Sequence, residues 1–370
     1  MSRRRVRTIL GLLWILDGLL QLQRSMFTKA FANQVLDPAG QGQPWLVSQP
    51  VALTSRLVAT HPVPWNLAFA VIQLSLGIGF LLPRLVRPAL VASVAWAAGV
   101  WWLGEGLGGL AGGHADLLTG APGAVLLYAV LAVAVWPRTG SDGAEYGPLP
   151  GWLAVAWATL WIGAAVLRLL PGQGSSDAIG SEISANGGSS PAWLAHIDNS
   201  VAGAVSPLGV GLVVAWVLVC VAIGLGGLRA GSMRAAAATA GILCSAIFWF
   251  VGQSLGQPWS GTATDPNTAP LVVLMAFALL GIGAPAPVHG RHRRHATASA
   301  IGPTHRGRDG VQGGSPVAVA QTAQYMHPAV DTLPGGRELR TEWNWPAADQ
   351  QPVLTPAPDP SELEPVSITR

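Results

Sequence analysis

The stretch WWLGEGLGGLAGGHADLLTGAP, residues 101–122, decides how the chain is organised. It leaves an apolar segment, becomes rich in glycine and re-enters an apolar segment at its end. A degenerate copy, WFVGQSLGQPWSGTATDPNTAP, occupies residues 249–270. The matched landmarks, without a gap, are Trp101 with Trp249, Gly104 with Gly252, Glu105 with Gln253, Leu107 with Leu255, Gly108 with Gly256, Gly113 with Gly261, and Ala121-Pro122 with Ala269-Pro270. Such self-similarity predicts an internal duplication.

The composition is that of a membrane protein. Half of the 370 residues are hydrophobic, 11% are charged, and the mean hydropathy is +0.42. Because a backbone in hydrocarbon must satisfy its own hydrogen bonds, the apolar stretches are expected to be helices. These stretches are residues 8–23, 63–82, 88–103 and 121–136, followed by 152–170, 208–228, 235–251 and 270–282. The predicted fold is an all-α polytopic bundle of eight transmembrane helices, arranged as two parallel four-helix repeats.

The predicted domains follow from this duplication. Residues 1–137 form the first membrane repeat and residues 138–287 the second. Residues 288–370 are rich in Pro, Gly, Ala, Thr and Gln, which is typical of a disordered cytoplasmic tail. The motif WNWP at 343–346 is the one short segment in this tail that could contact a soluble partner.

The tail begins with a basic cluster, HGRHRRH, at residues 289–295. His289, His292 and His295 have a spacing that would suit metal capture. The interleaved arginines would repel a cation, and they favour contact with anionic lipid headgroups instead.

Arginine is distributed unevenly between the connections. The connections expected inside contain Arg3, Arg4, Arg5, Arg7, Arg84, Arg87, Arg138, Arg229, Arg234, Arg291, Arg293 and Arg294. The connections expected outside contain only Arg24, Lys29 and Arg56, over longer lengths. This bias predicts a multi-pass protein of the plasma membrane with both termini in the cytoplasm, and a pseudo-twofold axis along the membrane normal.

Two tryptophan-led amphipathic segments, residues 44–60 and 191–205, are too short and too polar to span a bilayer. We expect them to lie flat on the outer membrane surface.

Few residues inside the predicted spans carry chemistry. Asp17 lies near the middle of the first span, where an ionised carboxylate costs about 2.5–3.5 kcal/mol, so it should face a partner or a wet cavity. Arg168 is its candidate partner, and Glu105 is a second candidate partner of Arg168. With Gln253, the repeat counterpart of Glu105, these residues form the predicted substrate site. The competing interpretation is a structural ion pair between the halves, or side chains that reach the outer interface.

Two His-x-Asp pairs, His114 with Asp116 and His196 with Asp198, are weak metal candidates. Their ligands would have to converge from separate loops, so solvated loop residues are the competing interpretation. No cofactor is expected. Zinc-helix, nucleophile-elbow, phosphate-loop and CxxC motifs are missing from the sequence, which argues against an enzyme. The inside arginines account for the net charge of +3, and nothing favours nucleic-acid binding.

Three segments, LGLLWILDGLLQLQ at 10–23, GEGLGGL at 104–110 and GAPGAVLLYA at 120–129, resemble a group of uncharacterised multi-pass membrane proteins of actinobacteria. The resemblance covers most of residues 8–285 and implies a plasma-membrane location without a biochemical role. The Leu-Gly opening and the Asp-Gly pair of the first helix are also similar to DoxX-type four-helix membrane proteins. No function is transferred from that similarity.

Two functions follow from these features. The first is a small-solute or ion transporter with a polar site between the repeats. The alternative is a non-transporting membrane anchor or envelope assembly factor, which acts through the outer amphipathic segments and the tail. A membrane-embedded enzyme that uses Glu105 or the outer histidines ranks behind both.

Overall fold

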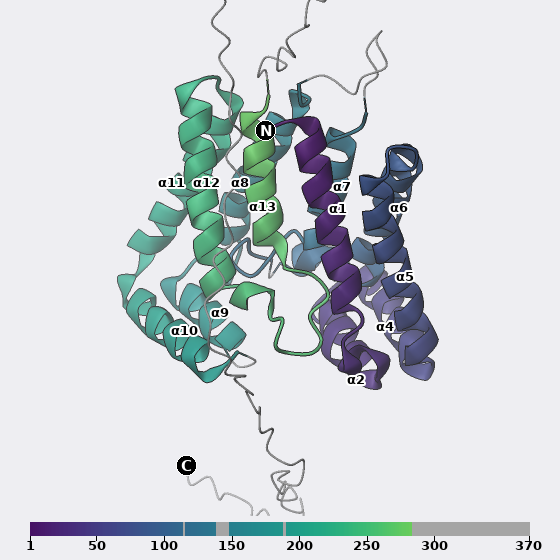
Figure 1. Ribbon diagram of the computed structural model, residues 1–370. Coiled ribbons are helices and arrows are strands. Elements are labelled where there is room, and N and C mark those ends of the chain that lie inside the picture. Colours follow the sequence, from purple (N-terminus) through teal and green to yellow (C-terminus); the bar gives the residue numbers. More distant parts are fainter. Residues whose placement is uncertain (114, 138–147, 188–189, 283–370) are drawn as a thin grey trace, which may run out of the picture. The chain divides into compact units, whose positions relative to one another are not determined.

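The computed structural model describes residues 1–113, 115–137, 148–187 and 190–282, and every regular element in these ranges is a helix (Figure 1). Each of the predicted apolar stretches forms a helix. The helices are α1 (Arg3–Leu20), α5 (Pro62–Leu81), α6 (Val86–Leu103), α7 (Ala124–Ala134), α8 (Trp152–Arg168), α11 (Val210–Leu228), α12 (Ser232–Val251) and α13 (Thr268–Leu280). Four of them, α5, α6, α11 and α12, are long and apolar enough to cross a membrane.

The predicted tail, with its histidine–arginine cluster and its WNWP motif, lies outside the described residues.

The two amphipathic segments are also helices, α4 (Trp45–Thr60) and α10 (Ala192–Val205). Figure 1 shows both at the end of the bundle where α1 finishes. The short elements α2 (Lys29–Phe31), η2 (Ala32–Leu36) and α3 (Asp37–Gly40) precede α4, and α9 (Ser176–Gly187) precedes α10. Each half of the chain therefore places a helical arm between its first and second apolar helices.

Helix α1 buries one stripe and exposes another. Val6, Leu10 and Trp14 recur every four residues and are fully buried, which is the spacing that puts side chains on one helical face. The Trp14 indole donates a hydrogen bond to the Ser93 hydroxyl of α6, at 3.0 Å, so its one polar atom is satisfied in the core. The opposite face exposes large apolar side chains, Leu12, Leu16 and Leu19.

Glycine sets the approach of α1 to α5, and the same contact recurs between α8 and α11. A Cβ atom on Gly77 would lie 2.5 Å from Ile15 Cγ1. A Cβ atom on Gly224 would lie 2.8 Å from Ile162 Cγ1. Both glycines therefore allow a backbone to pass close to an isoleucine, and both contacts join the first and second apolar helices of their half.

A second matched contact joins the next helices in each half. A Cβ atom on Gly79 of α5 would lie 2.7 Å from the Ala89 Cβ of α6. A Cβ atom on Gly226 of α11 would lie 2.9 Å from the Ala237 Cβ of α12. Small residues thus bring consecutive helices together at corresponding positions, the device that membrane helices use to pack closely.

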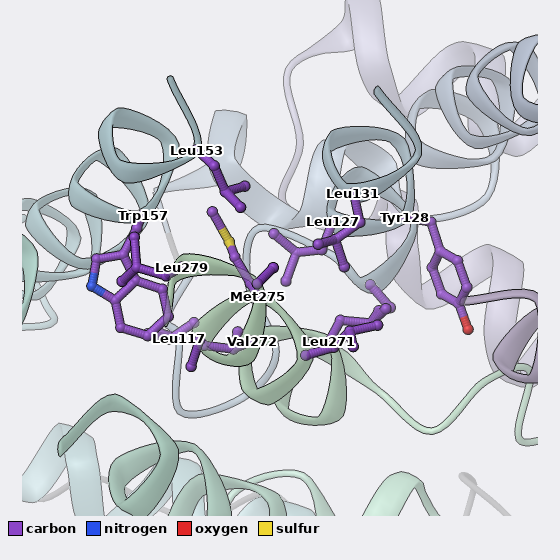
Figure 2. Packing of buried hydrophobic residues seen from close by; sticks show 14 of the residues in the cluster. Leu117, Leu127, Tyr128, Leu131, Leu153, Trp157, Leu271, Val272, Met275 and Leu279 are labelled. Atoms are coloured by element: carbon purple, nitrogen blue, oxygen red, sulfur yellow. The ribbon is translucent and has the colours of Figure 1, made fainter. Parts of the chain in front are cut away.

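Apolar side chains of α7, α8 and α13 meet in the centre of the bundle (Figure 2). Met275 of α13 lies between Leu153 of α8 and Leu127 of α7, and all three are buried. The two halves are therefore joined by a continuous core as well as by their loops.

The start of the chain and the end of α13 lie at the same end of the bundle (Figure 1). The Met1 carbonyl oxygen lies against Gly281. The Arg3 guanidinium donates to the carbonyl oxygens of Ala134 (2.6 Å), Trp136 (2.8 Å) and Pro148 (2.6 Å). One buried arginine thus ties the N-terminus to the connection between α7 and α8.

Candidate functional site

The glycine-rich stretch after α6 positions Glu105. Helix α6 stops at Leu103, and the backbone then turns through positive φ angles at Gly106 (54°) and Gly108 (62°). The Trp101 indole donates to the Pro122 carbonyl, at 2.7 Å, and closes this loop against the start of α7. Glu105 is thereby held where its Oε1 accepts from the Val125 backbone N–H, at 3.4 Å. A carboxylate at a helix N-terminus interacts favourably with the helix dipole.

The second half repeats this geometry with an amide. Trp249 donates to the Pro266 carbonyl at 2.8 Å, and Gln253 Oε1 accepts from the Ala269 N–H at 3.0 Å. Structurally, Pro266 corresponds to Pro122. The gapless alignment, which paired Pro122 with Pro270, is wrong by four residues here, because Pro270 lies within α13.

Gln253 does not share the surroundings of Glu105. Its Nε2 donates to the Leu117 carbonyl of the first half, at 3.1 Å, and its Oε1 is already occupied. Both ends of the amide are satisfied, so Gln253 joins the two halves. Glu105 Oε2 accepts no hydrogen bond.

Asp17 and Glu105 line one cavity of about 220 Å³, the inner cavity, which lies among α1, α5 and α6. Aromatic side chains form much of its wall: Trp14, Phe31, Phe69 and Trp96. The sequence-predicted pair of carboxyl groups is therefore brought to the same place, although the two residues are far apart in the chain.

Several oxygen atoms in the inner cavity have no partner. Asp17 is 2% exposed, and its Oδ1 accepts no hydrogen bond. The Oε1 atoms of Gln21 and Gln73, both buried, are also without partners. The Tyr128 hydroxyl of α7 faces Asp17. Since buried polar groups are normally hydrogen-bonded, these acceptors indicate a place for a ligand that donates.

A second, more polar cavity of about 620 Å³ adjoins the first and is called the vestibule here. It lies between the glycine-rich loops of the two halves, and Glu105, Thr264 and Asp265 line both cavities. Asp265 is held by the Thr264 hydroxyl and the Asn267 N–H, each at 2.7 Å. The two cavities therefore adjoin at these three residues, and Asp17 lines the inner one.

The carboxyl groups at this junction hold their protons more tightly than usual. Burial, followed by the negative charge of Asp265, raises the pKa of Glu105 well above its usual value. Burial also raises the pKa of Asp265. Among the described residues that line the two cavities there is no lysine or arginine to offset this charge.

Arg168 is not the partner of Asp17 or Glu105, and the structure corrects that prediction. Its guanidinium forms ion pairs with Asp116 (2.6 Å) and Glu182 (2.9 Å). It also lies over the Trp216 ring, 5.1 Å from the ring centroid. Arg168 is fully buried and lines neither cavity. It links the arm helix α9 of the second half to the loop that follows η3 (Gly106–Gly112) in the first half.

The interpretation of Asp116 as a solvated loop residue, which competed with a metal role, is corrected too. It is fully buried, and its Oδ1 accepts from the Leu118 N–H at 2.7 Å. Burial raises its pKa to about 6, although the positive charge of Arg168 opposes the rise. Asp116 is thus a structural partner of Arg168.

The other metal candidates are not brought together with it. His114 lies outside the described residues, while His196 and Asp198 lie on α10. Within the described part of the chain, no group of three or more His, Cys, Asp or Glu side chains is arranged to hold a metal ion.

Comparisons with protein-family models, with curated proteins and with solved structures gave no match. The function must therefore be argued from the cavities and their residues.

Sequence reasoning missed Glu182, Asp265 and Tyr128. The sequence does contain a signal for α9, the helix that carries Glu182. Ser175 precedes this helix and caps it, because its hydroxyl accepts from the Ala178 N–H at 3.0 Å. Ile179 and Ile183 follow at a spacing of four residues and are both buried. Nothing local marks Asp265 or Tyr128 as neighbours of Glu105 and Asp17.

Asp198 gives a prediction about stability. It is fully buried, both its carboxyl oxygens lack partners, and burial raises its pKa to about 6. The wild type therefore loses stability relative to Asp198→Asn as the pH rises from the unfolded-state pKa, 3.8, to about 6. At about pH 7.5 the variant is expected to be more stable by about 1 kcal/mol, with the gain lost near pH 4. Thermal unfolding at both pH values measures this, and a gain that persists at the lower pH contradicts it.

Proposed function

We propose that this chain is a multi-pass plasma-membrane protein that binds a small solute or ion in the inner cavity and passes it across the bilayer. The observation that carries the proposal is a polar vestibule that shares Glu105, Thr264 and Asp265 with the inner cavity, where the Oδ1 atom of the buried Asp17 accepts no hydrogen bond. An unpaired carboxyl group inside a membrane bundle is costly, and such groups usually serve a transport pathway.

The correspondence between contacts in the two halves supports the proposal. The matched glycine contacts and the two indole-to-proline hydrogen bonds occur at corresponding places in the two halves. Proteins built from membrane repeats place their substrate sites near the repeat interface, next to interrupted segments. Here the interrupted segments are the two glycine-rich loops that border the vestibule.

Eight spans and cytoplasmic termini fit the same picture. Large apolar side chains are also exposed on helices other than α5, α6, α11 and α12, as lipid-facing residues would be; on α1 they are Leu12, Leu16 and Leu19. The connections at the N-terminal end of the bundle contain Arg84, Arg87, Arg229 and Arg234, and arginine collects on the cytoplasmic side. The vestibule then faces outward.

The test is uptake by proteoliposomes. The full chain, reconstituted and exposed to a small-molecule cell extract, is expected to accumulate at least one solute above protein-free liposomes, as measured by mass spectrometry. Asp17→Asn is expected to lower this uptake at least about tenfold, a loss of about 1.4 kcal/mol of stabilisation, with normal protein abundance in the membrane. Asp37→Asn is the matched control, because Asp37 is an exposed carboxylate on α3, and it should leave uptake unchanged.

Uptake that survives Asp17→Asn would overturn the proposal. A phenotype that follows deletion of residues 296–370, with Asp17 dispensable, would favour the anchor or assembly function instead.

A further inference from the structure

We propose that the ligand of the inner cavity is a small organic cation, a protonated amine carried on an apolar or aromatic body. This rests on the solute-binding function proposed above and names the class of solute. The observation behind it is a cavity with acidic, acceptor-rich polar groups and aromatic walls.

The polar groups of the inner cavity select for a donor with positive charge. Asp17, Glu105 and Asp265 all line it, and no described lysine or arginine does. Unpartnered acceptor oxygens belong to Asp17, Gln21, Gln73 and Glu105. A carboxylate ligand would find no lysine or arginine in the lining to pair with, and a neutral hydrocarbon would leave these oxygens unpaired at a cost of about 1–3 kcal/mol each.

The walls select for an apolar body. The centroid of the Phe69 ring is 5.7 Å from that of Trp96 and 6.2 Å from that of Phe31, and all three residues line the cavity. Aromatic faces bind organic ammonium groups through cation–π attraction, worth ~2 kcal/mol or more when water is excluded. The volume, about 220 Å³, is several times the ~30 Å³ that one water molecule occupies.

A bare metal cation fits this chemistry less well. Calcium takes about 6–8 oxygen ligands, and magnesium demands a close octahedral arrangement. In the described ranges, no three His, Cys, Asp or Glu side chains converge closely enough to hold one ion, so Asp17, Glu105 and Asp265 are too dispersed for it. Carboxyl groups spread over a mainly apolar wall suit an extended molecule with one charged end.

The acidity is particular to the first half. Gly77 contacts Ile15 as Gly224 contacts Ile162, which places Ala164 at the position that corresponds to Asp17. Gln253 corresponds to Glu105, so neither carboxyl group has a charged counterpart. If Asp17 and Glu105 had a purely structural role, we would expect carboxyl groups at the corresponding positions of the second half. A ligand site needs them in one half only.

Binding to full-length protein in phosphatidylcholine nanodiscs tests the proposal. The probes are 2-phenylethylamine as the cation, 2-phenylethanol as a neutral analogue, 3-phenylpropanoate as an anion, and sodium chloride. Isothermal titration, with empty nanodiscs subtracted, is expected to show saturable amine binding at least about tenfold tighter than that of the alcohol, and no binding of the anion.

The variants separate charge from space. Asp17→Asn is expected to weaken amine binding at least about tenfold, and Asp37→Asn should leave it unchanged. Gly99→Leu is a second variant that does not depend on tolerance at Asp17, because Gly99 lines the cavity and a Cβ atom there meets nothing within 4 Å. It is expected to block binding by filling the cavity while the protein stays folded.

Equal binding of the alcohol or the anion, or wild-type amine binding by both Asp17→Asn and Gly99→Leu, would overturn the inference. The two proposals can fail separately. Asp17-dependent uptake of a solute that is not an amine would refute the organic cation and retain transport, whereas amine binding without uptake would refute transport and retain the ligand class.

Discussion

Arg168→Leu is expected to destabilise the folded protein by about 3–5 kcal/mol, the cost of breaking a buried ion pair by removing one partner. Asp116 would be left fully buried without its cation, and Glu182 would lose both of its charged hydrogen bonds, at 2.9 and 3.1 Å. Thermal and denaturant unfolding in a fixed detergent would measure the loss. Arg168→Lys is expected to restore only part of it, because an ammonium group cannot bind two carboxylates through a planar fork.

Two comparisons make this prediction specific. Arg56→Leu removes an exposed arginine and should change stability by no more than about 0.5 kcal/mol. The double variant Arg168→Leu, Asp116→Leu should be more stable than Arg168→Leu alone, because no buried charge at Asp116 is then left unpaired. A loss below about 1 kcal/mol would show that the Arg168 ion pairs contribute little to the fold.

The cost of Arg168→Leu should also depend on pH. The pKa of Asp116 is raised from 3.8 to about 6. As the pH falls, the folded protein therefore binds this proton at about pH 6, whereas the unfolded chain binds it only near 3.8. Below about pH 6 Asp116 becomes neutral, and the loss of Arg168 then leaves less uncompensated charge. The destabilisation is expected to be smaller at about pH 5 than at about pH 7.5.

Gly108→Ala is expected to be the second severe change, with a loss of about 2–5 kcal/mol from backbone strain and overpacking together. Gly108 has a φ of 62°, and a Cβ atom there would collide with the Pro122 carbonyl. The atoms that this Cβ atom would meet belong to the backbone of Pro122 and Gly123, not to a flexible side chain, so the loop must move. The Trp101–Pro122 hydrogen bond and the position of Glu105 should be lost with it, and ligand binding should fall in parallel with unfolding stability.

Gly113→Ala is the matched control in the same loop. Gly113 has a φ of 74°, but a Cβ atom there meets nothing within 4 Å. It should cost only the left-handed backbone penalty, about 1–2 kcal/mol. Gly256→Ala in the second half, where the Cβ atom would lie 2.8 Å from the Pro266 carbonyl carbon, should behave like Gly108→Ala. Equal effects of Gly108→Ala and Gly113→Ala would show that close packing of this loop is unimportant.

Hydropathy located the helices well, because a helix in a membrane must be a continuous apolar run of sufficient length. It also singled out Asp17 and Glu105 as acidic residues of the predicted spans, and both line the inner cavity. Hydropathy could not identify the ion-pair partners of Arg168, because the charge of a side chain does not show which loop packs against it. Asp116 illustrates the difficulty: a polar residue in a glycine-rich loop usually faces water, and here tertiary packing buries it.

The register of the second loop shows another limit. Pairing Pro122 with Pro270 by sequence was plausible, but the indole of Trp249 selects Pro266, and Gln253 then meets Ala269. The indole donor and the carbonyl acceptor are 21 residues apart in the first half and 17 in the second, and the hydrogen bond forms in both. Only the spatial contacts reveal which proline is equivalent.

The three carbonyl oxygens that receive the Arg3 guanidinium have a consequence for biosynthesis. Ala134, Trp136 and Pro148 are added to the growing chain more than a hundred residues after Arg3. At ~5–20 residues per second, the ribosome needs on the order of ten seconds to supply them. During that interval the Arg3 guanidinium lacks these three acceptors, so the start of α1 reaches its final position only after α7 has been made. A bulky fusion at the front of the polypeptide would obstruct this late docking step.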